Sequence, residues 1–215
     1  MHRALTAFVG AVARGGAIVA IAAAASTVAH AAADPSKVIR HVFPAAETGF
    51  DPAGVQDLYS ATIEQMLFET LLTYDYLARP AKLVPLTAEA LPQVTDNGQT
   101  YTIKLKKGIH FTPDPAFKGI KRELVADDYV YSLKRLLDAR VRASQQGEIE
   151  PYIVGAEEAA EKSRKTGKFD YDAPIEGLKA LDRYTFQVKL KQPIYVFIYN
   201  FADCRIACAV ARSTK

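Results

Sequence analysis

The chain has 215 residues, of which 49% are hydrophobic and 24% are charged, and its formal net charge is +3. These values are typical of a globular protein with enough apolar material for one or two cores, and they exclude a disordered or fibrous chain. Loss of an N-terminal segment with Arg3 and Arg14 would leave the charge close to neutral. No nucleic-acid partner is expected, because nucleic-acid binding normally requires a concentrated basic surface.

Residues 1–31 have the pattern of a secretory signal peptide. A basic start precedes the uncharged run "AIVAIAAAA", and "VAHA" then places small residues at Ala29 and Ala31. The uncharged run is well short of the roughly 20 apolar residues that span a bilayer core, which disfavours a membrane anchor. The pattern predicts export to the periplasm, with cleavage after Ala31 or Ala33.

The segment after the signal peptide predicts a strand, a loop and a helix. Residues 37–43 alternate in polarity and predict the strand, and Asp51-Pro52 and Gly54 mark the loop. Residues 56–74 carry apolar side chains at nearly helical spacing and predict a helix with one buried face. Prolines interrupt residues 80–92. We expect the chain to enter a second subdomain there.

The next segments predict a hairpin and a long helix. Residues 91–95 and 99–106 are the expected strands, and Asp96-Asn97-Gly98 is the expected turn between them. Residues 126–141 have the clearest helical spacing in the chain. Asp127 and Asp128 favour the N-terminal end of this helix, where the helix dipole is positive.

A second alternating run, residues 183–193, has the same pattern as residues 99–106. In both runs apolar side chains lie on one face and lysines on the other. This pattern predicts an antiparallel sheet that is buried on one face and solvated on the other. Between the two runs, a short helix is expected to stop at Gly167.

The last residues, "DCRIACAVARSTK", show no helical pattern. Cys204 and Cys208 are four residues apart, and a pair with this spacing inside one helix rarely meets disulfide geometry. A zinc site would need further ligands that the segment lacks. Two free thiols are therefore expected, and neither a metal nor a cofactor is predicted.

The chain carries no motif that predicts catalysis. His110 and Asp114 lie in a polar loop, and their closeness in sequence does not establish a shared acid–base pocket. Neither a dinucleotide-binding nor a phosphate-binding glycine motif is present. Tyrosines that could stack on a ligand are expected in the core instead. These are Tyr59, Tyr74, Tyr76, Tyr101, Tyr129 and Tyr131.

Several segments, taken together and in order, resemble the family 5 solute-binding proteins of bacterial ABC importers, which include periplasmic dipeptide- and oligopeptide-binding proteins. The resemblance covers residues 37–201. Thr70 stands where the family usually has Gly, and Val125 stands where a helix-capping Thr is usual. The matching segments are Asp51-Pro52, Phe68–Leu71, Pro85–Glu89, Asn97–Gly108 and Ala126–Ser132.

The resemblance implies an α/β fold, the first lobe of a two-lobed type II periplasmic binding protein with an inserted α+β subdomain. Residues 32–84 and 193–215 would belong to the first lobe, and residues 85–192 would form the subdomain. The second lobe is expected to be missing. Residues 203–215 are interpreted as the aberrant end of a truncated or frame-shifted product.

The resemblance also implies a function and a site. Ligand contacts are expected in the loop that leads into the first helix, at Gln56, Asp57 and Tyr59. The implied partners of a monomeric protein are a peptide or similar small solute and an inner-membrane ABC permease. An exported hydrolase and a non-functional fragment of a binding protein remain as alternatives.

Overall fold

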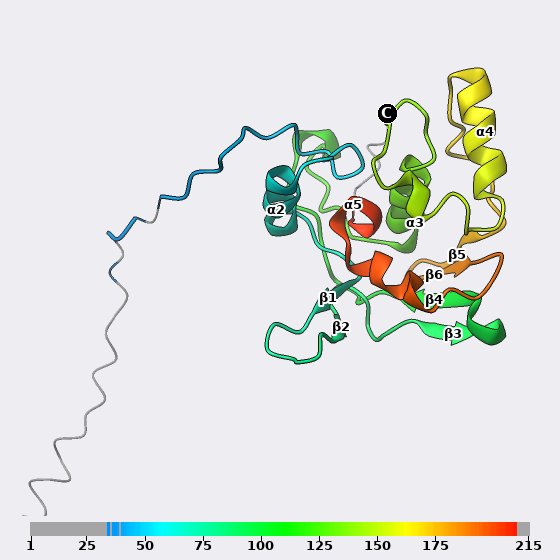
Figure 1. Ribbon diagram of the computed structural model, residues 1–215, viewed down its shortest axis with the longest axis horizontal. Coiled ribbons are helices and arrows are strands. Elements are labelled where there is room, and N and C mark those ends of the chain that lie inside the picture. The colour runs from blue at the N-terminus through cyan, green and yellow to red at the C-terminus, as the bar shows by residue number, and fades with distance from the viewer. Residues whose placement is uncertain (1–33, 35, 39, 210–215) are drawn as a thin grey trace, which may run out of the picture. The chain divides into compact units, whose positions relative to one another are not determined.

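The computed structural model describes residues 34, 36–38 and 40–209, so the expected signal peptide lies outside the described residues. The chain divides into two units, residues 1–42 and 43–215, and all elements named below belong to the second unit. No helix among the described residues is long and apolar enough to cross a membrane. The elements (Figure 1) are α2 (Leu58–Leu67), β1 (Leu72–Tyr74), β2 (Leu83–Pro85), β3 (Gln93–Thr95), β4 (Thr100–Lys104), α3 (Ala126–Arg135), α4 (Ala156–Thr166), β5 (Leu178–Asp182), β6 (Thr185–Lys189) and α5 (Cys204–Ala207).

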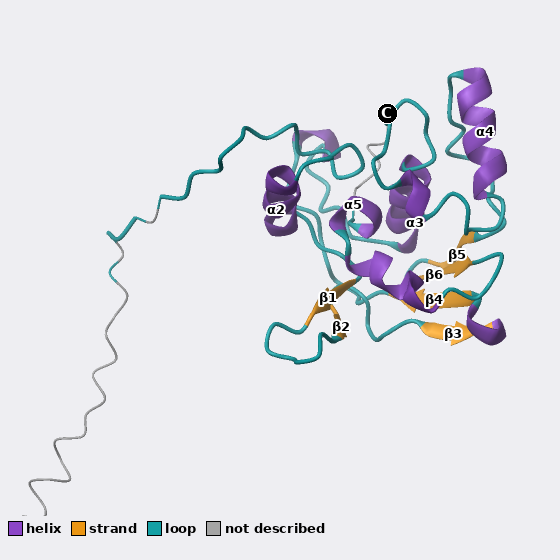
Figure 2. Cartoon of the chain, viewed as in Figure 1, coloured by secondary structure: helices purple, strands orange, loops and turns teal. Residues whose placement is uncertain are grey.

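The larger of the two sheets has four antiparallel strands in the order β3-β4-β6-β5 (Figure 2). In the pairing of β4 with β6, Tyr101 lies opposite Val188 and Ile103 lies opposite Phe186. All four side chains are buried, whereas the lysines that end both strands are exposed. The prediction of an antiparallel sheet with one buried face is therefore confirmed.

The turn between β3 and β4 is the one that the sequence predicts. Asp96, Asn97 and Gly98 have φ angles of 50°, 54° and 90°, a left-handed backbone that Asp, Asn and Gly tolerate best. The first strand, Gln93–Thr95, is shorter than the expected residues 91–95. The turn fixes the register that brings Val94 opposite Tyr101.

Helix α3 packs on the buried face of this sheet. The ring of Tyr129 lies 5.8 Å from that of Phe186, nearly parallel to it, and the Tyr129 hydroxyl is 2.6 Å from that of Thr87. Although Val125 has no capping oxygen, the Asp128 carboxylate accepts a hydrogen bond from the Val125 amide at 2.9 Å. Asp128 also pairs with Arg122, so the start of α3 is held without the usual capping residue.

Helix α3 ends at Arg135, earlier than the expected residue 141. Just beyond this end, the Asp138 carboxylate accepts hydrogen bonds from the Arg140 amide at 3.0 Å and from its guanidinium at 2.9 Å. Such a side-chain turn competes with helical hydrogen bonds and redirects the backbone. Helix α4 stops at Gly167 as predicted, with Gly167 in the left-handed conformation.

The helix expected over residues 56–74 is correct only for α2. Beyond α2 the backbone pairs with distant segments: the Leu71 carbonyl accepts from the Leu86 amide at 3.0 Å, and Leu72 pairs with Pro85 in a two-stranded sheet. These contacts replace the helical hydrogen bonds and bury Leu71 and Leu72. The strand expected over residues 37–43 is also wrong, since its described residues lack strand structure.

The described part of the C-terminal segment contains one short helix, although its sequence shows no helical pattern. Asp203 caps the single turn of α5 by accepting a hydrogen bond from the Arg205 amide at 2.9 Å. Cys208 then forms an antiparallel bridge with Thr70. Ile206, which lies within α5, is buried in the core. This segment therefore packs against the chain that follows α2.

Glu64 is a buried carboxylate on the inner face of α2. Its side chain is fully buried, and within the described part of the chain neither carboxylate oxygen has a hydrogen-bond partner. Loss of hydration, together with the negative charges of Asp51, Asp57 and Asp203, raises the pKa of Glu64 to about 7, and the charge of Arg205 opposes this rise. Glu64 is therefore partly protonated near neutral pH.

The first prediction concerns the sheet core. Replacing Phe186 by Ala removes a fully buried ring of β6 that stacks on Tyr129 of α3, and we expect the free energy of unfolding to fall by about 3 to 5 kcal/mol in urea denaturation. The control, Lys189→Ala, alters an exposed side chain on the same strand and should change it by no more than about 0.5 kcal/mol. Equal effects of the two substitutions would contradict the proposed core.

The second prediction concerns pH. Because the pKa of Glu64 rises from 4.5 to about 7 on folding, the folded state binds this proton more tightly than the unfolded state. The stabilisation that comes from protonated Glu64 is fully present below pH 4.5 and is lost as the pH rises through 7. Between these values the free energy of unfolding should fall by about 3 kcal/mol in denaturation at a series of pH values.

The matched variants for this measurement are Glu64→Gln and Glu69→Gln. The Glu64→Gln variant should lose the slope, because the amide does not titrate. Glu69 is exposed five residues further along, so Glu69→Gln should retain the slope of the parent chain. An unchanged slope in Glu64→Gln would show that another group titrates in this range.

Candidate ligand-binding pocket

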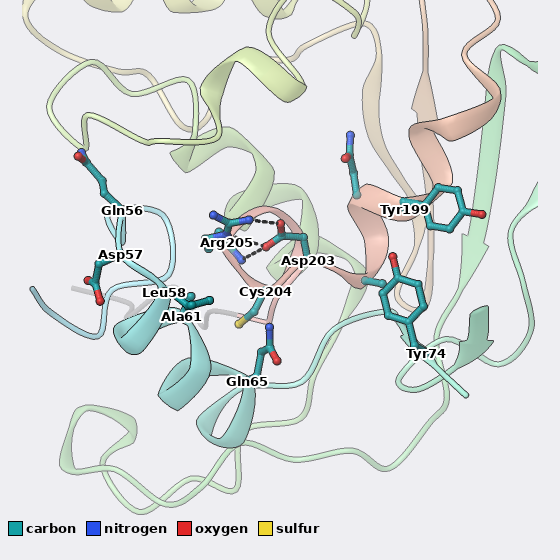
Figure 3. A pocket seen from close by; sticks show the side chains of 12 residues that line it. Gln56, Asp57, Leu58, Ala61, Gln65, Tyr74, Tyr199, Asp203, Cys204 and Arg205 are labelled. Carbon is teal, nitrogen blue, oxygen red and sulfur yellow. Dashed lines mark hydrogen bonds and ion pairs between the residues drawn. The ribbon is translucent and has the colours of Figure 1, made fainter. Parts of the chain in front are cut away.

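A pocket of about 540 Å³ lies where three distant segments of the second unit meet. Figure 3 shows Gln56 and Asp57 at one side, Tyr74 and Tyr199 at the other, and Arg205 between them. The segments are residues 56–65 at the start of α2, Tyr74 of β1, and residues 199–205. Each end of the pocket therefore carries a different chemistry, polar at one side and aromatic at the other.

Asp57 is both the N-terminal cap of α2 and a wall of the pocket. Its carboxylate accepts hydrogen bonds from the Ser60 amide at 2.8 Å and from the Thr48 hydroxyl. These hydrogen bonds, those from Ser60 foremost, hold the pKa of Asp57 well below its usual value. Asp57 is therefore an anion at any physiological pH, beside the exposed amide of Gln56.

The structure brings two of the three expected site residues together. Gln56 and Asp57 line the pocket, whereas Tyr59 is half-buried and packs against Phe43 with 5.4 Å between ring centroids. Tyr59 is not among the residues that line the pocket. A role for any of the three in binding remains a prediction.

The opposite wall was missed by sequence reasoning. The rings of Tyr74 and Tyr199 stack with centroids 6.3 Å apart, and both are about half exposed at the pocket. The expectation that Tyr74 is a core residue is therefore wrong, as it is for Tyr76, which is 86% exposed. Tyr101 and Tyr129 are buried as expected. The alternation of polarity at residues 72–76 is too short to predict which tyrosines are exposed and which are buried.

A bidentate ion pair lies between the two sides of the pocket. The Arg205 guanidinium donates to the Asp203 carboxylate at 2.7 and 3.1 Å, and both residues line the pocket. This pairing raises the pKa of Arg205. The wall therefore presents a cation and an anion that are already paired.

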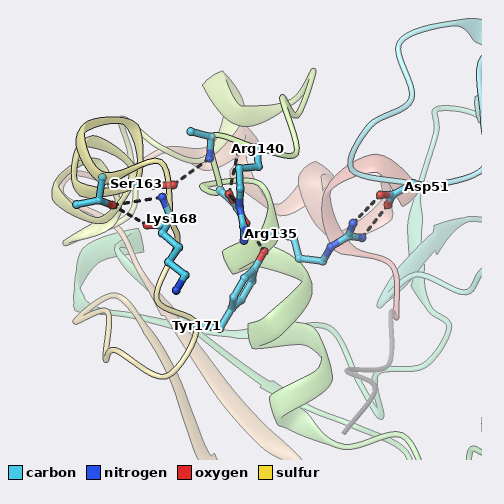
Figure 4. A network of polar contacts seen from close by, with 9 residues as sticks. Asp51, Arg135, Arg140, Ser163, Lys168 and Tyr171 are labelled. Carbon is cyan, nitrogen blue, oxygen red and sulfur yellow. Dashed lines mark hydrogen bonds and ion pairs between the residues drawn. The ribbon is translucent and has the colours of Figure 1, made fainter. Parts of the chain in front are cut away.

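A second ion pair holds the loop that precedes the pocket. Arg135 at the end of α3 binds both carboxylate oxygens of Asp51, at 2.6 and 2.7 Å (Figure 4). The Tyr171 hydroxyl, labelled in Figure 4, donates a hydrogen bond to the Asp138 carboxylate at 2.8 Å and so helps to fix the chain after α3. The loop with Gln56 is thus tied to the helix that covers the sheet.

The aromatic wall is anchored to the same sheet. Phe197 and Phe201 are buried, and their rings lie 5.7 and 5.8 Å from that of Tyr101 on β4. The Tyr101 hydroxyl donates to the Ile194 carbonyl at 3.1 Å. These contacts fix the turn that carries Tyr199.

A second pocket, of about 860 Å³, is lined mainly by apolar side chains between the end of α2 and residues 109–117. His110 and Asp114 line it, but each serves the local loop: His110 contacts the Gly108 carbonyl at 2.8 Å, and Asp114 accepts from the Ala116 amide. Among the residues that the structure describes, no three His, Cys, Asp or Glu side chains cluster as metal ligands.

Comparison with known proteins places this chain among solute-binding proteins. Residues 82–214 match the model of the bacterial extracellular solute-binding proteins, family 5 middle. Di/tripeptide-binding protein 1 of Pseudomonas aeruginosa is 30% identical over 159 residues, which are 72% of this chain and 26% of that protein. The peptide transport periplasmic protein SapA of Salmonella typhimurium is 29% identical over 143 residues, which are 66% of this chain and 23% of that protein.

Solved structures show the same fold. OppA of Burkholderia pseudomallei has a TM-score of 0.61 and 24% identity, covering 79% of this chain and 29% of that one. Peptide-bound OppA of Listeria monocytogenes has a TM-score of 0.58 and 22% identity, covering 75% and 28%. The chain thus spans about a quarter of the length of the curated relatives it matches.

These structures confirm the expected fold class, part of a lobe of a type II periplasmic binding protein. The curated relatives are binding and transport proteins and not enzymes, as expected. The family match continues to residue 214, through the segment interpreted from sequence as aberrant. Because the match covers more than half of its length, the chain belongs to family 5 of the bacterial extracellular solute-binding proteins.

Proposed function

We propose that this chain acts as a substrate-binding component of an ABC-type importer. It captures a peptide or similar small solute in the periplasm as a monomer, after cleavage of its signal peptide, and delivers the solute to an inner-membrane permease. Membership of the family and the names of the relatives, which include di/tripeptide-binding proteins, support this proposal.

The observation that carries the proposal is the combination of groups in the pocket beside α2. A short peptide has a cationic amino group, an anionic carboxyl group and amide groups between them. The ionised Asp57 suits the peptide's amino group, and the Arg205 guanidinium suits its carboxyl group. The Gln56 amide provides both a donor and an acceptor for the peptide backbone.

The aromatic wall adds a less specific surface. Tyr74 and Tyr199 present half-exposed rings on which apolar side chains of different sizes pack. Contacts of this kind tolerate variation in a ligand's side chains, whereas the charged groups recognise its ends. We therefore propose recognition of short peptides by their termini.

The larger pocket is a weaker candidate for peptide binding. Its walls include Met66, Leu67 and Phe111, and neither Lys nor Arg is among the described residues that line it. We favour the smaller pocket because it combines charges of both signs with the loop that the family resemblance indicates. The described residues would form one side of a ligand cleft, since such clefts bury most of a ligand's surface.

The test is isothermal titration of the purified chain with dipeptides and tripeptides, comparing the parent chain with Asp57→Asn. Asn retains the helix cap but removes the charge, so the fold is preserved while the contact to the peptide amino group is weakened. We expect affinity to fall about tenfold or more, the usual effect of losing a charge-assisted hydrogen bond.

Asp127→Asn is the matched control, because it removes an exposed carboxylate from the first turn of α3, outside the pocket. It should leave affinity unchanged. Equal affinity of Asp57→Asn and the parent chain would place the site elsewhere, with the larger pocket as the next candidate. Absence of any peptide binding, or release of cleaved peptide products, would contradict the proposed function itself.

A further inference from the structure

Cys204 and Cys208 are two thiols buried side by side in the core. Their exposed fractions are 3% and 2%, neither is in a disulfide, and both line one small void. The solute-binding function uses neither of them. Their closeness raises the question of what such a pair does.

The sequence argument against a disulfide assumed that both residues lie in one helix. In the structure α5 ends at Ala207, and the backbone of Cys208 is extended, with φ −96° and ψ 156°. The direction of the Cys208 side chain is therefore not set by helical geometry. The objection based on spacing does not apply to this pair.

Contacts on both sides hold the pair against the chain that follows α2. The Cys204 thiol lies 3.9 Å from the Glu64 carbonyl, within α2. Cys208 bridges to Thr70, and the Ala209 amide donates to the Glu69 carbonyl at 3.1 Å. Because neighbouring parts of one segment hold both cysteines, they stay close together in the folded chain.

A small void and the candidate ligand pocket both adjoin this pair of residues. A void of about 10 Å³ adjoins Cys204 and Cys208, so a small movement of either side chain meets no close packing there. Cys204 also lines the candidate ligand pocket (Figure 3), which is the route by which a small solute would approach its side chain. Cys208 does not line that pocket.

We propose that Cys204 and Cys208 are a redox pair that closes to an intramolecular disulfide by exchange with a small disulfide entering through the pocket. The Cys204 thiol loses its proton and attacks one sulfur of the reagent, RSSR. A mixed disulfide forms and one thiol, RSH, is released. The Cys208 thiol then loses its proton and attacks the Cys204 sulfur, releasing the second RSH. RSSR is reduced and the two cysteines are oxidised.

The order of the two steps follows from the environment of each thiol. In the reduced pair the adjacent Cys204 thiol and burial raise the pKa of the Cys208 thiol. A thiolate is the attacking species in exchange, so the residue that faces the pocket, Cys204, reacts first. This inference is independent of peptide binding and goes beyond the proposed function.

The test uses the full reduced chain, incubated under native conditions with glutathione disulfide and then treated with iodoacetamide. Intact mass spectrometry should show loss of both free thiols and of two hydrogen atoms, with no glutathione retained and no dimer on a non-reducing gel. In Cys208→Ser the reaction should stop at a glutathione adduct on Cys204. In Cys204→Ser the remaining Cys208 should react much more slowly.

Three results on the parent chain alone would overturn the inference, so its test does not depend on the folding of the variants. These are stable glutathione adducts, intermolecular disulfides, and thiols that react only after denaturant is added. Circular dichroism of each variant establishes whether its reactivity is that of a folded chain. Faster reaction at Cys208 than at Cys204 in the folded variants would reverse the proposed order.

Discussion

The antiparallel pairing of β4 with β6 is the constraint on which the rest of the second unit depends. It joins residues 85 positions apart at Thr102 and Gln187 and aligns the apolar face on which α3 packs. Closing so long a loop costs conformational entropy, which the free energy of a well-packed apolar interface must offset. The stacked rings of Tyr129 and Phe186 and the fully buried Ile103 provide that interface.

Both sides of the candidate pocket are positioned from this core by separate routes. Arg135 on α3 holds the loop before Gln56 through Asp51, while Tyr101 on β4 holds the aromatic wall through Phe197. The pocket is thus assembled from segments that are far apart in sequence but are anchored to the same core. Such an arrangement fixes the spacing between the polar and the aromatic side of the pocket.

Sequence reasoning succeeded where the signal is local and failed where partners are distant. The alternation in β4 and β6 and the turn at Asn97 are encoded by adjacent residues, and the family resemblance predicted the fold. The predicted end of the first helix was too late, because the backbones of Leu71 and Leu72 pair with residues 85 and 86 and not within a helix. The aromatic wall and the packed C-terminal segment likewise depend on contacts that no local pattern reveals.

The sheet ends in strand β3, which is only three residues long and carries Gln93 and Thr95 on either side of Val94. Its outer edge offers a strand from another molecule few backbone hydrogen bonds and one half-exposed apolar side chain. Short polar edges of this kind resist edge-to-edge pairing between copies. A chain with this edge is protected on that side from growing into a continuous intermolecular sheet.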